Sequence, residues 1–154
     1  MLMLLFFVGE DAYAVDCQYI QEVIPKVNLK KIPHAPSAVA GLITISGQPI
    51  TVVDFSQVIA NRPSAQSLHT RIILFSIEMP SGITKVLGLI AEKIIEIIDR
   101  EPVEFIETGI KVKDLPYLEG VCIEKSGSIQ LFNAVEFFQS MQNVFNESLT
   151  DEKL

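Results

Sequence analysis

One segment of the sequence occurs twice, and this repeat constrains the fold more than any other feature. Residues 41–59 read GLITISGQPITVVDFSQVI and residues 120–138 read GVCIEKSGSIQLFNAVEFF, so the two copies are offset by seventy-nine positions. Each copy has two short apolar runs around a Ser-Gly turn, followed by Asp54 or Asn133, residue types that cap helices. We therefore expect a β-hairpin and a short helix in each half of the chain.

A weaker echo precedes each copy of the repeat. Residues 19–24 read YIQEVI and residues 93–98 read KIIEII. A repeat of this length is too long for a solenoid unit and indicates a duplicated half-domain. The alternative is coincidence, because a hairpin followed by a helix is a common motif. We expect a single domain over residues 1–154 with two halves, about 1–60 and 70–140, and a chain that crosses between them.

The first hairpin allows a more detailed prediction. Its apolar and polar residues alternate, so we expect one face to be buried and to carry Ile43, Ile45, Ile50 and Val52. The turn is expected over residues 46–49, with Gly47 at the first central position. Asp54 then caps a helix, and Gln57 completes a capping box three residues later.

Composition excludes several classes of protein. Nearly half of the 154 residues are apolar, which supplies a core and argues against disorder. The net charge of −7 argues against a nucleic-acid-binding surface. Cys17 and Cys122 form no CxxC motif and lie in apolar strand-like segments, so we expect buried, reduced thiols.

The apolar N-terminus, MLMLLFFV, does not have the features of a signal sequence. It lacks a basic beginning, it spans only eight residues, and the acidic pair Glu10-Asp11 follows it. It is also much shorter than a membrane span. We expect a first β-strand that is buried on both faces, in a protein of the cytoplasm.

The remaining segments are assigned from apolar runs and breakers. We expect strands at 4–8, 13–16, 19–24, 71–77 and 84–90, an edge strand at 26–32, and one helical turn at 37–40. Residues 61–68 form a polar linker, and residues 101–116 a second connector. Residues 91–99 fit both helix and strand, and the echo with residues 19–24 favours a short turn followed by a strand. Residues 143–154 are expected to be a frayed acidic tail.

The sequence contains no recognisable catalytic constellation. Its two histidines, His34 and His69, are far apart in the sequence, and no HExxH, GxSxG, P-loop or dinucleotide-binding motif is present. Glu22 interrupts an apolar run and should face outward, where a partner can reach it. We expect a protein that is not an enzyme and that needs no cofactor or metal.

The order of these motifs resembles the CheW family of bacterial chemotaxis coupling proteins. The similar features are the strand–turn–strand start, the QEVI segment, the basic and proline-containing connector, and the hairpin that ends in Val-Asp-Phe. In the second half, VLGLIAEKIIEII and LPYLEGV resemble the family's later segments. The resemblance covers about residues 4–138.

This resemblance implies an all-β fold, mainly β with short helices, built as two pseudo-symmetric five-stranded β-barrels. It also implies a non-enzymatic adaptor that couples the cytoplasmic tip of a methyl-accepting chemoreceptor to the regulatory domain of a CheA-type histidine kinase. The family's receptor groove then maps to Ile20, Glu22, Gly41 and Ser46, and its kinase contacts to Gly47, Gln48 and Asp54.

The sequence departs from the family pattern at three places. Thr44 stands where the family usually has Asn, and Ser46 where it usually has Arg, a residue linked to partner contact. Ala91-Glu92 stands where a Val-Asp pair is common. Two other hypotheses therefore remain open: a divergent CheW-like protein that binds a different protein partner, and a carrier that binds a small ligand between the barrels.

Overall fold

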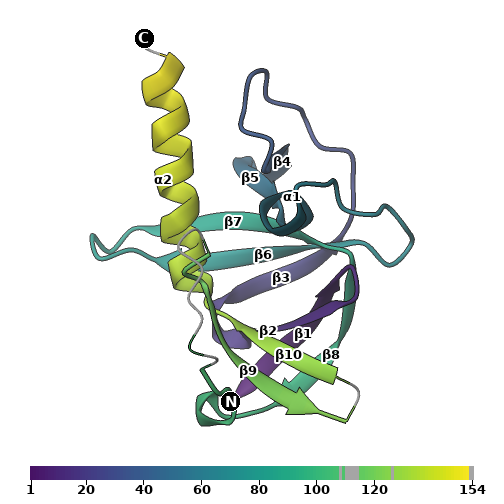
Figure 1. Cartoon of the computed structure of the whole chain (residues 1–154). Coiled ribbons are helices and arrows are strands. Elements are labelled where there is room, and N and C mark those ends of the chain that lie inside the picture. Colours follow the sequence, from purple (N-terminus) through teal and green to yellow (C-terminus); the bar gives the residue numbers. More distant parts are fainter. Residues whose placement is uncertain (108, 110–114, 126, 153–154) are drawn as a thin grey trace.

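The computed structural model describes residues 1–107, 109, 115–125 and 127–152, and it is mostly β (Figure 1). In this part of the chain, two five-stranded sheets pack against each other. The first, which we call the terminal sheet, has the strand order β8-β1-β2-β10-β9. Its strands are β1 (Leu2–Val8), β2 (Asp11–Asp16), β8 (Lys93–Asp99), β9 (Leu118–Glu124) and β10 (Gly127–Phe132).

The second sheet, which we call the central sheet, has the strand order β3-β6-β7-β5-β4. Its strands are β3 (Ile20–Pro25), β4 (Val39–Ile45), β5 (Gln48–Asp54), β6 (Arg71–Glu78) and β7 (Thr84–Ala91). Two α-helices and two 3-10 turns complete the described elements: α1 (Phe55–Ala60), α2 (Ala134–Glu152), η1 (Cys17–Tyr19) and η2 (Pro102–Glu104).

The two sheets are built on the same plan from the two halves of the chain. An antiparallel hairpin lies inside each sheet, β1–β2 in one and β6–β7 in the other. The hairpin β6–β7 pairs with β3 and, in parallel, with β5, which precede it in the sequence. The hairpin β1–β2 pairs with β8 and, in parallel, with β10, from the far end of the chain. The two halves thus exchange hairpins. The central sheet comes from the continuous stretch 20–91, whereas the terminal sheet combines residues 2–16 with residues 93–132.

The repeat found in the sequence is also a repeat in structure. Asp54 N–H donates to the carbonyl of Ala38 at 2.8 Å, and Asn133 N–H donates to the carbonyl of Tyr117 at the same distance. The two donor residues are seventy-nine positions apart in the sequence, and so are the two acceptor residues. Ser126, in the turn of the second copy, lies outside the described residues.

The sheets are open rather than closed barrels, which corrects that part of the prediction. In the described part of the chain, β8 and β9 are the edges of the terminal sheet, and β3 and β4 those of the central sheet. The connectors lie along two of these edges, through the antiparallel bridges Lys30–Leu42 and Ile106–Val121. Sequence pattern predicts strands, whereas closure depends on how far each sheet curls.

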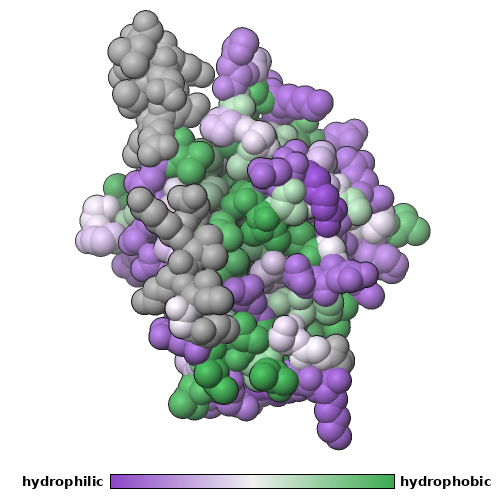
Figure 2. Space-filling model, viewed as in Figure 1, coloured by the Kyte–Doolittle hydropathy of each residue, from purple (hydrophilic) through white to green (hydrophobic). Residues whose placement is uncertain are grey.

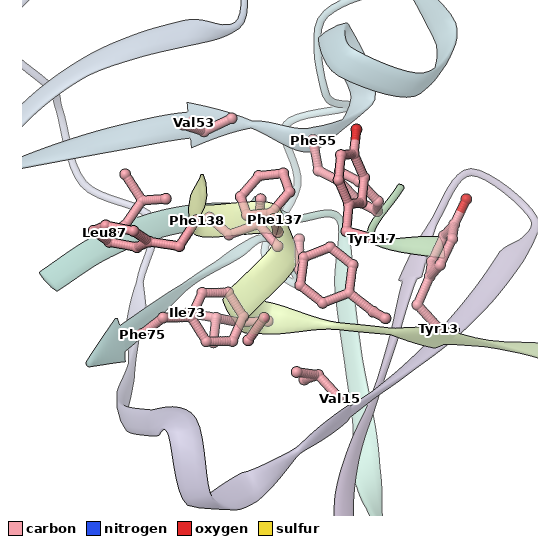
Figure 3. Close-up of a cluster of buried hydrophobic side chains, with 14 of the residues drawn as sticks. Tyr13, Val15, Val53, Phe55, Ile73, Phe75, Leu87, Tyr117, Phe137 and Phe138 are labelled. Atoms are coloured by element: carbon pink, nitrogen blue, oxygen red, sulfur yellow. The ribbon is translucent and has the colours of Figure 1, made fainter. Parts of the chain in front are cut away.

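Three groups of buried side chains hold this arrangement together. Two smaller groups each belong to one sheet, the first around Met3 and Cys122 in the terminal sheet and the second around Val52 and Ile72 in the central sheet. The largest lies between the sheets and includes Phe55, whose ring centroid is 5.1 Å from that of Tyr13 and 5.4 Å from that of Phe132 (Figure 3). Because side chains on both faces of a strand are buried, β1 and β6 read as continuous apolar runs.

Several local predictions are confirmed, among them the buried N-terminal strand. Residues 93–99 form strand β8 after a bend at Glu92, as the echo favoured. Cys17 and Cys122 are free thiols, half-buried and buried, and burial raises the pKa of both.

Other local predictions are wrong. Residues 26–32 contribute one bridging residue rather than an edge strand, because Pro25 and Pro33 bound a segment that bends over β4. Residues 37–40 turn directly into β4 instead of forming a helical turn. The tail prediction is not among the wrong ones: residues 143–152 belong to α2, in line with the helix-compatible stretch of the sequence, and residues 153–154 lie outside the description.

Burial in the first hairpin is uneven, and this changes the expected cost of mutations. Ile50 and Val52 are buried as predicted, whereas Ile43 and Ile45, on edge strand β4, are only half-buried.

We expect Ile72→Ala, at a fully buried position, to lower the free energy of unfolding by about 2–5 kcal/mol, and Ile45→Ala to cost less. Urea unfolding of both variants measures this. Equal losses would contradict the assignment of β4 as a solvent-facing edge.

Candidate protein-binding surfaces

The tip of the β4–β5 hairpin is exposed and tightly defined. Ile45 pairs with Gln48, so Ser46 and Gly47 alone form the turn, with φ of 50° and 77°. Positive φ at both central positions is the geometry of a type I′ turn. Ser46, not Gly47, therefore holds the first central position, which corrects the predicted turn. The side chains of Ser46 and Gln48 are both exposed to solvent.

Gly41 is a structural glycine at a crossing of two segments. Its φ is 151°, and a Cβ added to it would lie 2.6 Å from the carbonyl oxygen of Lys30. Lys30 and Leu42 exchange both backbone hydrogen bonds there, at 2.8 and 2.9 Å. Gly120 repeats this arrangement, since its Cβ would lie 2.8 Å from the carbonyl carbon of Phe105. Because Gly41 is buried, changing it tests the fold rather than a partner contact.

Asp54 is buried and works within the protein. Its carboxylate accepts hydrogen bonds from Ser56 N–H at 3.1 Å, from Ser64 N–H at 2.9 Å and from the Ser64 hydroxyl. It caps α1 as predicted, and it also holds the linker that follows the helix. The hydrogen bonds from Ser64 to Asp54 could not be predicted, because Ser64 lies in a polar loop whose sequence has no periodicity.

Ile20 and Glu22 lie on edge strand β3, on opposite faces. The register shifts between them, from Ile20 opposite Phe75 to Glu22 opposite Leu74. Phe75 belongs to the core between the sheets and Leu74 to the core of the central sheet. Residues that pair across strands share a face, so Ile20 faces the other sheet and Glu22 faces away from it. Ile20 is half-buried, and Glu22 is exposed as predicted.

The four residues expected in a receptor groove do not form one cluster. Strands β3 and β4 are opposite edges of the central sheet. Ile20 faces the inter-sheet core from one edge, while Gly41 and Ser46 lie on the strand and tip at the other. Of the four, only Glu22 and Ser46 are exposed.

Two apolar residues that the sequence reasoning missed occupy equivalent edge positions. Val23 pairs with Ile73, and Ile97, seventy-four residues later, pairs with Leu4. Ile73 and Leu4 both belong to the core between the sheets, so Val23 and Ile97 extend that apolar face onto the edge strands. Their exposed fractions are 38% and 60%, and Leu2, on the same face of β1 as Leu4, is 58% exposed. The echo between residues 19–24 and 93–98 was the signal that could have found this pair.

The core between the sheets also reaches the surface between the two helices. Figure 2 shows apolar side chains gathered in a central recess over β7, between α1 and α2. Half-buried Val58 and Ile59 of α1 and Val135 of α2 pack against this core. The protein therefore presents apolar surface along the junction of its two sheets, which is typical of a protein-binding site.

Comparison with known proteins agrees with this architecture. The model of the CheW-like domain matches residues 2–142, which is nearly the whole chain. The chain belongs to the CheW-like family. This CheW-like domain is 24% identical over 96 residues to the chemotaxis protein CheW of Rhizobium meliloti (strain 1021), a match that covers 62% of this chain and 59% of that protein.

The fold of the CheW-like domain also matches a solved structure. The crystal structure of the scaffolding protein TtCheW from Thermoanaerobacter tengcongensis superposes with a TM-score of 0.73 and 24% identity, over 86% of this chain and 84% of that one. In the described part of the chain, no helix is long and apolar enough to span a membrane. The same residues contain no group of three or more side chains suited to hold a metal ion.

The two glycines of the first hairpin allow a matched test of the crossing at Gly41. We expect Gly41→Ala to destabilise the CheW-like domain by about 2 kcal/mol or more, because the new Cβ meets a backbone carbonyl that cannot move alone. Gly47→Ala should cost only the strain of positive φ, about 1 kcal/mol, since its Cβ would meet nothing within 4 Å. Thermal unfolding of both variants separates the two effects. The interpretation fails if Gly47→Ala is the more damaging change.

Proposed function

We propose that this CheW-like domain is a non-enzymatic adaptor that couples chemoreceptors to a CheA-type histidine kinase, in chemotaxis or a related chemosensory pathway. Such an adaptor works in the cytoplasm and catalyses nothing. It holds two partners in a fixed geometry, so that the state of one controls the other. The family match over residues 2–142 carries this proposal.

The receptor tip, in this proposal, contacts the apolar face along the junction of the two sheets. Val23 and Ile97 supply exposed apolar side chains on strands, and half-buried Ile20 lies on the same face of the central sheet as Val23. Glu22 lies at the rim of this contact, on the other face of β3. An apolar centre with a polar rim is the usual composition of a protein interface.

The kinase regulatory domain, in this proposal, contacts the tip of the β4–β5 hairpin. Gly47 and Gln48 are exposed there, and Ser46 offers a short hydroxyl where an arginine would offer a charged fork. Asp54 contributes indirectly, by fixing α1 and the linker behind the hairpin. With no arginine at the tip, binding should depend less on salt than a charge-steered interface does.

A binding experiment with point variants tests the receptor surface. We expect Val23→Asp and Ile97→Asp each to weaken binding of the cognate receptor tip at least about tenfold, because each places an unpaired charge in a contact that must lose its water. Leu68→Asp is the matched control, since Leu68 is 91% exposed on the linker. Isothermal titration calorimetry at two salt concentrations measures the affinities, and circular dichroism checks the fold.

Two outcomes would change the proposal. If both edge variants stay folded and bind the receptor tip like the unmodified protein, the junction of the sheets is not the receptor surface. If the unmodified protein binds neither the receptor tip nor the kinase regulatory domain, the adaptor function itself fails. The hypothesis of a divergent CheW-like protein with a different partner then replaces it.

A further inference from the structure

A polar hollow lies on the central sheet, away from the apolar junction described above. Its walls are the connector after β3, the start of α1 and the linker over residues 61–68, which pass beside one another in Figure 1. Its volume is about 500 Å³, within the range of about 300–1,000 Å³ that is usual for small-molecule sites. Polar residues that line it include Lys26, Asn28, Lys31, Gln57, Ser64 and Gln66.

The charge around this hollow is opposite to that of the whole protein. The chain carries a net charge of −7, yet residues 23–53 contain three lysines and no aspartate or glutamate. Two of these, Lys26 and Lys31, line the hollow. The only carboxylate among the lining residues is that of Asp54, so two positive charges face one negative charge and the hollow favours anions on an otherwise acidic protein.

The carboxylate that lines the hollow is held by uncharged groups and forms no ion pair with either lysine. Asp54 already accepts three hydrogen bonds, from Ser56 N–H and from both the N–H and hydroxyl of Ser64. Among the ion pairs formed by the described residues, none involves Lys26 or Lys31. The ammonium of Lys26 donates to the neighbouring carbonyl of Val27 at 3.2 Å and has two further N–H groups to offer.

We propose that this hollow binds a small organic anion, a molecule with a phosphate monoester or carboxylate group. Lys26 and Lys31 bind the charged group. The amides of Asn28, Gln57 and Gln66 hydrogen-bond to the uncharged polar part, and Leu29 and Ile90 provide an apolar floor. Such a site goes beyond the adaptor function, and it would allow a metabolite to bind the adaptor without occupying the junction of the sheets.

NMR titration of the full chain tests this proposal. The probes are adenosine monophosphate for a phosphate monoester, citrate for a carboxylate, and adenosine as the uncharged control, at about 0.15 M ionic strength. We expect saturable shifts of the amide signals of residues 26–31 and 64–66 with at least one anion, at a Kd below about 1 mM. The anion that binds tells the two chemistries apart.

A charge-removal variant decides whether the lysines carry the binding. Lys26→Gln/Lys31→Gln should weaken binding at least about tenfold, because charged hydrogen bonds are lost. Lys85→Gln, an exposed lysine on β7, is the matched control and should bind like the unmodified protein. Three results would overturn the proposal: no saturable shift with either anion, equal weakening by the control, or binding of poly-glutamate alone, which would indicate a docking surface for an acidic protein.

Discussion

The exchange of hairpins between the two halves is the constraint on which the rest of the structure depends. Strand β5 pairs with β4 in its own hairpin and, in parallel, with β7, and β10 pairs in the same way with β9 and β2. Parallel pairing requires a crossover. Between β5 and β7 the chain passes through α1 and β6, and between β2 and β10 it passes through the whole central sheet. Neither sheet is then complete without the other half of the chain, and the buried rings around Phe55 join both sheets into one core.

The connectors that cross edge strands β4 and β9 also decide which sheet edges remain available to a partner. Backbone hydrogen bonds join Lys30 of one connector to β4 and Ile106 of the other to β9. Gly41 and Gly120 permit this close approach, because a Cβ at either position would collide with the connector backbone. Unpaired edges tend to pair with other chains, so covering two of them limits where partners can attach. Strands β3 and β8 carry no such bridge among the described residues, and they are also the strands that present Val23 and Ile97. The same duplication that builds the core therefore produces the two exposed apolar positions.

Much of this could be predicted from the sequence, because the repeat and the apolar runs act locally. The β-hairpins, the buried first strand and the helix cap at Asp54 follow from pattern and residue type. The connector over residues 26–32 could not be predicted, since its alternation resembles a strand while its path is fixed by Pro25 and Pro33. It was also not predictable that the candidate groove residues lie on two different edges of the central sheet, because this depends on the order of the strands in the sheet. The bulge at Gln21, which turns Ile20 and Glu22 to opposite faces, also has no signature in the sequence.

The two halves have kept the same backbone but not the same charge. After β3 the connector contains Lys26, Lys30 and Lys31 without an acidic residue. Residues 100–116 contain both signs of charge: the acidic Glu101, Glu104, Glu107 and Asp114, and the basic Arg100, Lys111 and Lys113. Arg100, the first basic residue of that segment, is already paired with Glu124 at 2.7 Å. A scaffold with two equal ends would bind the same partner twice. The difference in charge makes the two ends unequal as surfaces for a partner, so charge breaks the equivalence that duplication created.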